Sequence, residues 1–553
     1  QWRLGSQFAR VADGIQTRDQ EIDADRGRIR DRRDGELAQD VAGRAIILNP
    51  RLVADPGATA ARLAKVLRAE PEEAELIRSR LQRAWDRKSY YCRVRARVER
   101  KEAEAIRQLA RSDPLLKGLF LERATVRVYP NAGEGIQVLG TVDLEGRGRG
   151  GVEGMYDEVL RGTPGRRRVR IDAAGDPIPE TADAEMEPVD GGDVRLTLDR
   201  DIQHIVETEL ASVAKAESPD AATAIVMAVG ADNPDSGHIL AMANWPTYRP
   251  GDRRIKEEFR RNRTITDIYE PGSTFKVITA AAALHYGVDT TSYCSGSWTV
   301  GRYTMHCAHQ KVHGPVPLRK MLSESCNLAA GTLAERLGER RFYDFIRRLG
   351  FGARTGVEFP LEAAGLLRKP SDWRRINTIN IGFGQGISVS PLQLIAAYGA
   401  VANDGWYVPP RLVLHAAGKE AAARPPRRVM SAQTARAVRS YMQAVVSIGS
   451  GMRAQIPGYT VSGKTGTAQL VENGRYSDGY VASFAGMVPA RKPQLAILVS
   501  VWRPRKRQYG GEVAAPAFRN IARKCILYLE IPEDSPLDRR DGAKEIYRSS
   551  VRD

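Results

Sequence analysis

A serine and a lysine placed three residues apart are the first candidates for chemistry in this sequence. Ser273-Thr-Phe-Lys276 follows a Pro-Gly pair and opens an apolar stretch that is predicted to be helical. Residues three apart share one face of a helix, so the hydroxyl and the amine can meet. A hydroxyl beside an amine is a nucleophile beside a base. Because such short patterns also occur by chance in long chains, the motif needs support from other residues.

Two further motifs follow in order along the chain. Ser325-Cys-Asn327 begins another predicted helix, where Ser and Asn are also ordinary N-cap residues. Lys464-Thr-Gly-Thr467 lies in a predicted strand, whose small residues allow another backbone to approach. Taken alone, Ser325-Cys-Asn327 is best explained as a helix cap, and Lys464-Thr-Gly-Thr467 as a surface strand. Together they place hydroxyl, amide and amine groups on the kinds of element that such chemistry needs.

Three of the five cysteines and one histidine have the composition of a structural zinc site. They are Cys294, Cys307, His313 and Cys326. Cys326 is also the middle residue of the second motif, so a metal would fix the start of that helix. His306 and His309 are alternative ligands. A Cys294–Cys307 disulfide and buried free thiols are competing interpretations of the same residues.

The elements that must position these motifs are strands at both ends of a helical region. The sequence predicts an amphipathic helix over 200–215 and a mainly helical stretch from 271 to about 445. It predicts strands at Thr223–Val229, Gly237–Ala243, Thr460–Leu470, Tyr480–Val488 and Leu495–Trp502. We therefore expect an α+β domain with flanking helices, its antiparallel sheet assembled from both ends of the segment.

The N-terminal region has a different pattern. Residues 1–45 are predicted as a helix followed by a hairpin turn at Asp34-Gly35, residues 56–113 as helical, and residues 119–172 as strand-rich. Residues 173–193 are polar and lack periodicity, which predicts a domain boundary. The expected domains are therefore an elongated, non-catalytic N-terminal domain over 1–190, a catalytic domain over 191–532 and a charged, poorly ordered tail over 533–553.

Composition limits the classes of function. The chain has 553 residues and a formal charge of +17, but its basic residues are spread out and no nucleic-acid-binding motif accompanies them. We therefore expect most of these residues to form a solvated basic surface, with no nucleic-acid partner. Attraction toward a membrane surface or a pyrophosphate is the alternative interpretation. No apolar run reaches the roughly 18 residues of a membrane span. The sequence opens at Gln1 without an initiator Met or a signal peptide, which predicts that it was cut from a longer chain.

The three motifs in this order are the signature of class A β-lactamases and penicillin-binding proteins. The chain resembles the class B penicillin-binding proteins, which are monofunctional peptidoglycan D,D-transpeptidases, over nearly its whole length. The resemblance extends to Arg26-Gly-Arg-Ile-Arg-Asp31, Gly150-Gly-Val-Glu-Gly-Met-Tyr156, Gly382-Phe-Gly-Gln-Gly386 and Tyr509-Gly-Gly511. It implies a penicillin-recognising transpeptidase domain on a pedestal, or dimerisation, domain.

The resemblance also implies a role for each motif residue. Ser273 attacks the penultimate D-Ala of a stem peptide, Lys276 is its base, Ser325 relays a proton, and Asn327 holds Lys276 and the substrate. The third motif binds the terminal carboxylate of the stem peptide. The backbone N–H groups of Ser273 and Thr467 bind the oxyanion of the tetrahedral intermediate. The residues of that third motif are Lys464, Thr465, Gly466 and Thr467.

Partners and location follow only from the resemblance. Peptidoglycan stem peptides are the expected substrates, β-lactams the expected covalent inhibitors, and a membrane glycosyltransferase of the shape, elongation, division and sporulation class the expected partner. The catalytic domain is expected outside the bacterial cytoplasmic membrane, with an anchor beyond this sequence. The chemistry needs no cofactor, but elongation-type relatives carry a metal in the equivalent loop. Alternatives are a β-lactam-hydrolysing or β-lactam-sensing enzyme, or a D,D-carboxypeptidase. Division, elongation and sporulation roles all stay open.

Overall fold

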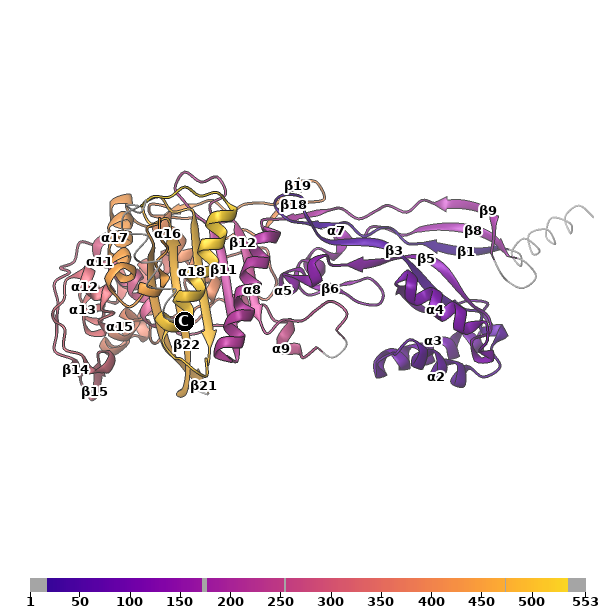
Figure 1. Cartoon of the computed structure of the whole chain (residues 1–553), viewed down its shortest axis with the longest axis horizontal. Helices are drawn as coiled ribbons and strands as arrows, with labels where there is room; N and C mark the ends of the chain where they lie inside the picture. Colours follow the sequence, from indigo (N-terminus) through magenta and orange to yellow (C-terminus); the bar gives the residue numbers. More distant parts are fainter. Residues whose placement is uncertain (1–16, 172–176, 253–254, 473, 536–553) are drawn as a thin grey trace, which may run out of the picture. The chain divides into compact units, whose positions relative to one another are not determined.

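A computed structural model describes residues 17–171, 177–252, 255–472 and 474–535 of the chain. The chain forms two compact units, which we describe separately (Figure 1). Unit 1 comprises Gln1–Leu196, Arg249–Ile255 and Leu414–Ala421, and unit 2 comprises Thr197–Tyr248, Lys256–Val413 and Ala422–Asp553. The helix expected at the start of the chain, and the tail beyond residue 535, lie outside the described residues. No described helix is long and apolar enough to cross a membrane.

Unit 1 is built on two large sheets, beside the short pair β6 (Thr141–Val142) and β7 (Gly148–Arg149). The larger has the strand order β19-β18-β10-β2-β3-β4, with β5 also paired to β3, and the smaller has the order β1-β8-β9. Helices α2 (Pro56–Val66), α3 (Pro71–Asp86) and α4 (Arg100–Ala110) contribute Leu63, Ile77 and Ile106 to a core that also contains Val94 of β4. The strands are β1 Thr17–Ile22, β2 Ile29–Arg30, β3 Glu36–Leu48, β4 Cys92–Val98, β5 Leu119–Val128, β8 Gly165–Ile171, β9 Pro177–Met186, β10 Val194–Leu196, β18 Val413–Ala416 and β19 Lys419–Glu420.

The hairpin expected at Asp34-Gly35 is confirmed. Asp34 has a φ of 64°, the Asp31 N–H donates to the Gly35 carbonyl at 2.8 Å, and Arg30 of β2 pairs with Glu36 of β3. Aspartate adopts this left-handed conformation more readily than most residues, and the turn reverses the chain directly into the longest strand of the unit.

Two sequence predictions for this unit were wrong. The segment 56–113 is not helical throughout, because Cys92–Val98 forms β4, paired antiparallel to β3. The segment 173–193, predicted to be irregular, contains β9, paired antiparallel to β8. In both cases pairing with a strand distant in the sequence overrides weak local preference, as expected for β-structure.

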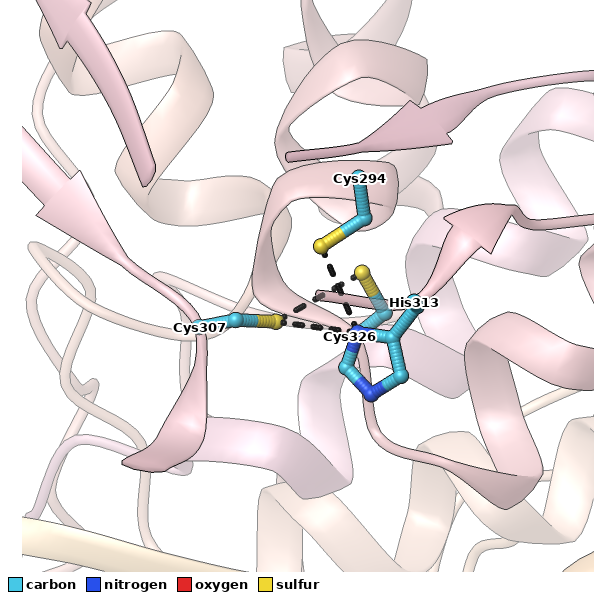
Figure 2. A group of neighbouring side chains, drawn as sticks. All are labelled: Cys294, Cys307, His313 and Cys326. Carbon is cyan, nitrogen blue, oxygen red and sulfur yellow. Dashed lines mark hydrogen bonds between the residues drawn. The ribbon is translucent and has the colours of Figure 1, made fainter. Parts of the chain in front are cut away.

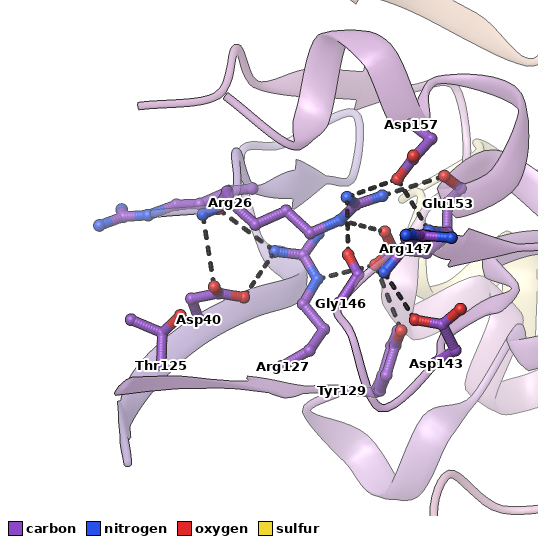
Figure 3. Close-up of polar contacts among 12 residues, drawn as sticks. Arg26, Asp40, Thr125, Arg127, Tyr129, Asp143, Gly146, Arg147, Glu153 and Asp157 are labelled. Carbon is purple, nitrogen blue, oxygen red and sulfur yellow. Dashed lines mark hydrogen bonds and ion pairs between the residues drawn. The ribbon is translucent and has the colours of Figure 1, made fainter. Parts of the chain in front are cut away.

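A buried ion-pair network joins segments of unit 1 that are far apart in the sequence (Figure 3). The Arg26 guanidinium contacts Glu153 and Asp157, each at 2.7 Å, and Arg127 contacts Glu153 at 2.7 Å and Asp40 at 3.3 Å. The side chains of Arg26, Arg127 and Glu153 are at most 2% exposed. Two of the segments that carry the family resemblance, those around residues 26 and 153, therefore meet in this network.

Unit 2 is organised around a five-stranded antiparallel sheet of order β12-β11-β23-β22-β21. Its strands are β11 Ala221–Ala228, β12 Ile239–Trp245, β21 Ser462–Glu472, β22 Arg475–Val488 and β23 Leu495–Trp502. The sheet thus combines strands from both ends of the unit, which confirms the α+β prediction. The predicted amphipathic helix is α8, Arg200–Glu217, with Asp199 accepting hydrogen bonds as its N-cap.

Helices cover both faces of this sheet (Figure 1). Alternate residues of β11, such as Ala224 and Val226, share a core with Val206 of α8 and Phe518 of α18 (Gly510–Tyr528). Met227, the residue after Val226, points to the other face. There its terminal methyl group lies so close to a glycine of α16 (Pro391–Ala402) that an added Cβ would be only 2.7 Å away. The helices that carry the first two motifs belong to the same unit as this sheet.

Candidate active site

Ser273 lies on a short 3-10 turn, η4 (Gly272–Phe275), that leads directly into helix α11 (Lys276–His285). Gly272 has a φ of 53°, and a Cβ there would lie 3.1 Å from the Cβ of Ala468 on β21. Only glycine allows this turn to approach the strand so closely. Lys276 is fully buried at the start of an apolar helix. The local sequence therefore places Ser273 close to the sheet and buries Lys276 away from solvent.

Ser325 lies in a tight connection between helices α12 (Leu318–Ser323) and α13 (Asn327–Leu337). Its φ of 55° is an uncommon backbone conformation for a residue other than glycine. Cys326 is the N-cap of α13, and its Sγ accepts the N–H of Ala329. The expected helix start is therefore correct, but the cap is the cysteine. The left-handed turn aims the Ser325 side chain at the start of α11.

The two motifs meet in one hydrogen-bonded chain. Ser325 Oγ lies 2.9 Å from Ser273 Oγ and 3.1 Å from Lys276 Nζ. Lys276 Nζ also donates to Asn327 Oδ1 at 2.6 Å and to the Ser325 carbonyl at 2.5 Å. No hydrogen bond joins Ser273 directly to Lys276 among these described residues. We call the path from Ser273 through Ser325 to Lys276 the relay.

The electrostatics of Lys276 suit a base. Burial lowers the pKa of its amine from 10.5 to about 8, because an ammonium ion loses its hydration there. The nearby thiols of Cys326 and Cys307 oppose this shift. A neutral amine has two N–H groups, which the Asn327 side chain and the Ser325 carbonyl can accept. Its lone pair is then left for the Ser325 hydroxyl.

The third motif lies on β21, beside η4. Gly466 has no room for a side chain, since a Cβ would lie 2.4 Å from Ser483 Oγ and 2.9 Å from Thr274 Cγ2. Lys464 is fully buried, and its Nζ donates to the carbonyl and hydroxyl of Thr465 at 3.1 and 3.2 Å. Burial, with a smaller contribution from Lys276, lowers the pKa of Lys464 well below its ordinary value. The Thr467 hydroxyl accepts the Gly510 N–H at 3.1 Å.

These motifs open into one groove of about 1190 Å³. Ser273, Ser325, Asn327, Thr465 and Thr467 line it, whereas Lys464 and Gly466 lie behind its surface. Sequence reasoning missed much of the remaining lining. The missed residues include Tyr303, Asn377, Asn380, Tyr476 and Tyr480. Tyr476 and Tyr480 lie on β22, which begins at Arg475, so extending the predicted Tyr480–Val488 strand toward the N-terminus would have included both.

Glu270 is another residue that the sequence reasoning did not single out. Its carboxylate accepts the N–H of Gly386 at 2.7 Å and the hydroxyl of Tyr476 at 3.2 Å. Burial raises the pKa of this carboxyl group. Because Tyr476 is on β22 and lines the groove, Glu270 ties one wall of the groove to the segment that leads into Ser273.

The four proposed metal ligands converge on one another (Figure 2). His313 Nδ1 lies 3.3 Å from Cys294 Sγ and 3.5 Å from Cys307 Sγ, and the sulfurs of Cys307 and Cys326 are 3.6 Å apart. All four residues are buried, and their ligand atoms lie within 4.8 Å of one another. His306, an alternative ligand by sequence, instead lines the groove. The side chain of His309 lies outside the described residues.

The donor set fits zinc. A tetrahedral site with Zn–S bonds of about 2.3 Å places sulfurs roughly 3.7 Å apart, close to the spacing of Cys307 and Cys326. The hydrogen bond from Cys326, together with the Asn327 N–H, lowers the pKa of the Cys307 thiol, which favours the thiolate that a metal needs. The cysteines are free thiols in the structure. His313 Nε2 is buried without a hydrogen bond and lies 3.9 Å from the Glu324 carboxylate.

This cluster touches the relay directly. Cys307 Sγ accepts the backbone N–H of Asn327 at 3.3 Å, and the Asn327 side-chain amide donates to the His306 carbonyl at 3.1 Å. Cys326 separates Ser325 from Asn327 in the chain. The orientation of Asn327, and through it that of Lys276, therefore depends on the loop that the cluster organises.

The chain was also compared with known proteins. Residues 227–523 match the penicillin binding protein transpeptidase domain, and residues 21–196 match the penicillin-binding protein dimerisation domain. Stage V sporulation protein D of Bacillus subtilis is 31% identical over 98% of this chain and 84% of its own length. The probable peptidoglycan D,D-transpeptidase PenA of Neisseria meningitidis is 32% identical over 94% of this chain and 87% of its own.

Solved structures agree with these relatives. The crystal structure of penicillin binding protein 3 from Mycobacterium tuberculosis, complexed with aztreonam, aligns with a TM-score of 0.70 at 29% identity. The alignment covers 94% of this chain and 99% of that one. A putative peptidoglycan glycosyltransferase from Atopobium parvulum aligns with a TM-score of 0.69 at 27% identity, covering 93% of this chain and all of that one.

Proposed function

The chain belongs to the penicillin-binding protein transpeptidases, and from this premise we propose that Ser273 is the nucleophile of its reaction. The protein is a serine-type D-Ala-D-Ala transpeptidase of cell-wall synthesis. The observation that carries the assignment of Ser273 is the relay, since it connects this hydroxyl through Ser325 to a buried lysine with a lowered pKa.

Acylation begins with attack of Ser273 Oγ on the carbonyl of the penultimate D-Ala. As the new C–O bond forms, the Ser273 proton passes to Ser325, whose own proton passes to the Lys276 amine. The tetrahedral intermediate carries an oxyanion, for which the backbone N–H groups of Ser273 and Thr467 are the proposed donors. The C–N bond then breaks, and the proton returns along the relay to the nitrogen of the departing D-Ala.

Deacylation uses the same groups in reverse. The amine of a second stem peptide attacks the ester carbonyl of the acyl-enzyme and forms the cross-linking amide. Its proton passes to Ser325 and Lys276, and the C–O bond to Ser273 breaks. The proton finally returns to Ser273 Oγ, so neither step consumes a proton overall. Strained β-lactam amides acylate the same oxygen, and their ring nitrogen takes the proton.

The terminal carboxylate of the donor peptide is bound at the third motif. The hydroxyls of Thr465 and Thr467 line the groove and can donate to it. The Lys464 amine lies against Thr465, behind the surface of the groove. A carboxylate bound at Thr465 favours the charged form of Lys464, because an opposite charge offsets the cost of burial. Asn327 positions Lys276 through its side-chain oxygen.

Cys294, Cys307, His313 and Cys326 are proposed to hold a structural zinc ion. The metal supplies no step of the chemistry; when bound, it fixes the loop before α13. The convergence of three sulfurs and one ring nitrogen on one buried point supports zinc over a Cys294–Cys307 disulfide, which would engage only two of these side chains.

The biological setting is proposed from family membership. The catalytic unit is expected to act on the outer face of the cytoplasmic membrane, next to a membrane glycosyltransferase that polymerises the glycan strands. The N-terminal region lacks the Glu-Asp-x-x-Phe motif with which bifunctional relatives polymerise glycan. Septal, lateral-wall and sporulation roles are all compatible with this assignment, and complementation of conditional mutants in each pathway distinguishes them.

Labelling with fluorescent penicillin tests the assignment of Ser273. The wild-type chain and a Ser447→Ala control, whose exposed serine lies at the end of α17 (Ala432–Ile448), should form a long-lived adduct. Ser273→Ala should form none. An adduct that persists in Ser273→Ala rejects the assignment. Rapid turnover of the adduct would indicate β-lactam hydrolysis. Release of free D-Ala without cross-linking, in the presence of acceptor peptide, would indicate a carboxypeptidase.

A further inference from the structure

A second cavity lies in unit 1 and is lined by arginines. It has a volume of about 450 Å³. Arg80 and Arg83 belong to α3, Arg87 is the C-cap of that helix, and Arg93 is on the adjacent strand β4. Positions 80, 83 and 87 fall on one face of the helix, which adjoins the buried face formed by Ile77 and Leu81. We call this space the arginine cavity.

The positive charge of the arginine cavity is only partly compensated. Arg80 pairs with Glu145 of the cavity wall at 2.6 Å, and Arg93 pairs with Asp23 at 2.9 Å. Within the described part of the chain, neither Arg83 nor Arg87 has a carboxylate within ion-pair distance. Arg93 also has a buried Nε that lacks a hydrogen-bond acceptor. Four guanidinium groups thus face one lining carboxylate, and buried donor capacity is left unused.

The cysteine in the lining, Cys92, adds no negative charge to the cavity. Burial raises the pKa of the Cys92 thiol to about 11, and the nearby Arg80 and Arg83 oppose this rise without reversing it. The thiol is therefore neutral at physiological pH. Tyr91, another lining residue, donates its hydroxyl to Glu122 at 2.8 Å, and the carboxylates of Glu122 and Asp23 act on Arg93 from outside the lining. The lining therefore provides hydrogen-bond donors and a positive potential for an anion, and Glu145 is its one carboxylate.

A solvated basic surface is the simpler explanation of most arginines in a chain of this charge. Two features separate this group from that background: the guanidiniums surround a cavity instead of a convex surface, and one of them has a buried, unused donor. Like charges three or four residues apart on a helix repel one another. A group with several oxygens and more than one negative charge can offset that repulsion and accept several N–H bonds at once.

We propose that the arginine cavity binds a phosphate-bearing group, which is held by Arg80, Arg83, Arg87 and Arg93. Phosphate and pyrophosphate match this lining better than a single carboxylate does. They offer more acceptor oxygens and more negative charge to the same guanidinium N–H groups. The group can come from a free phosphate compound or from the headgroup of an anionic lipid. The site is independent of the groove in unit 2.

Calorimetric titration of the full chain with inorganic pyrophosphate tests the proposal. We expect saturable binding of pyrophosphate. The affinity should fall by about tenfold or more in Arg83→Gln/Arg87→Gln, because this variant loses one or two charge-assisted hydrogen bonds. Arg107→Gln/Arg111→Gln is the matched control, since it removes the same charge from α4 and its C-cap, outside the cavity. Penicillin labelling of both variants should stay at the wild-type level, which shows that unit 2 is folded.

Vesicle sedimentation identifies the source of the phosphate. Vesicles of phosphatidylglycerol are compared with vesicles of phosphatidylcholine, with and without added pyrophosphate. Binding to the anionic vesicles that falls in Arg83→Gln/Arg87→Gln and is displaced by pyrophosphate supports a lipid headgroup. Pyrophosphate binding without vesicle binding supports a free phosphate compound. The proposal is rejected if neither probe binds, or if the α4 control weakens binding as much as the cavity variant does.

Discussion

The hydroxyl of Ser325 lies 2.9 Å from the hydroxyl of Ser273 and separates it from the amine of Lys276. The two serines are 52 residues apart in the chain: Ser273 lies on η4, and Ser325 lies in the turn between α12 and α13. Ser325 reaches this position through a left-handed backbone turn. A conformation of this kind costs roughly 1–3 kcal/mol and persists only where the surrounding structure enforces it. The same turn connects the relay to the proposed metal site through Cys326.

Replacing Ser325 tests whether it transfers protons. We expect Ser325→Ala to slow acylation by a β-lactam about 10²- to 10⁴-fold, the usual contribution of a positioned acid–base group. Second-order acylation rates from stopped-flow measurements provide the check. Ser325→Gly is the companion variant, because glycine tolerates the φ of 55° while also removing the hydroxyl. An acylation rate within about threefold of wild type in both variants would mean that Lys276 acts without Ser325.

The pH dependence of acylation should report on Lys276. The neutral amine is the base, and its pKa is lowered to about 8. The acylation rate should therefore rise with pH up to about 8 and level off above it. Lys276→Arg should form no adduct over this range, because a guanidinium stays protonated. A pH-independent rate between pH 6 and 9 would contradict this role for the lysine.

The same shift has a consequence for stability with a defined sign. The unfolded chain protonates Lys276 with its ordinary pKa of 10.5, whereas the folded chain protonates it at about 8. Between these values the unfolded state binds more protons, so this group makes the protein more stable as pH rises from 8 to 10.5. The difference in the slope of unfolding free energy against pH, between wild type and Lys276→Met, measures this contribution.

Metal removal should affect both stability and acylation. We expect protein purified without added zinc to contain about one zinc ion per chain, and Cys326→Ser to contain little. Chelation should lower the melting temperature by about 5 °C or more, equivalent to roughly 2 kcal/mol in a domain of this size. It should also slow acylation, because Cys307 accepts the Asn327 N–H.

Cys525→Ser is the control, since this thiol is buried outside the cluster. Protein without zinc that has lost two free thiols would establish a disulfide instead.

The buried network of unit 1 predicts a large effect at Glu153. Glu153→Gln removes the charge that compensates Arg26 and Arg127, both of which stay buried. Breaking a buried ion pair on one side usually costs about 3–5 kcal/mol. We expect a loss of unfolding free energy near the lower end of this range, because Asp157 and Asp40 still contact the two arginines. Denaturant unfolding of this variant and of Glu158→Gln, at an exposed position nearby, measures the difference; equal stabilities would reject the prediction.

The sequence predicted the sheet of unit 2 well because β11, β12 and β23 are short apolar runs bounded by turn residues. It failed at β4, where Cys92-Arg-Val-Arg-Ala-Arg-Val98 alternates arginine with smaller apolar residues within a region otherwise rich in helix-forming residues. The alternation was the available signal, but it is short. It also failed at β9, where two prolines and several acidic residues disfavour a strand. Pairing with β8 decides the conformation there, and no local pattern contains that information.

The sequence by itself determined which chemical groups this protein has. The spacing of Ser273 and Lys276 on one helical segment, and the set of three cysteines and one histidine, follow from residue types and order alone. Tertiary structure decided what those groups can do. It buried Lys276 and so lowered its pKa, and it placed Ser325 between the lysine and the nucleophile. Burial and contacts between distant segments depend on packing of the whole unit, which a local pattern does not specify.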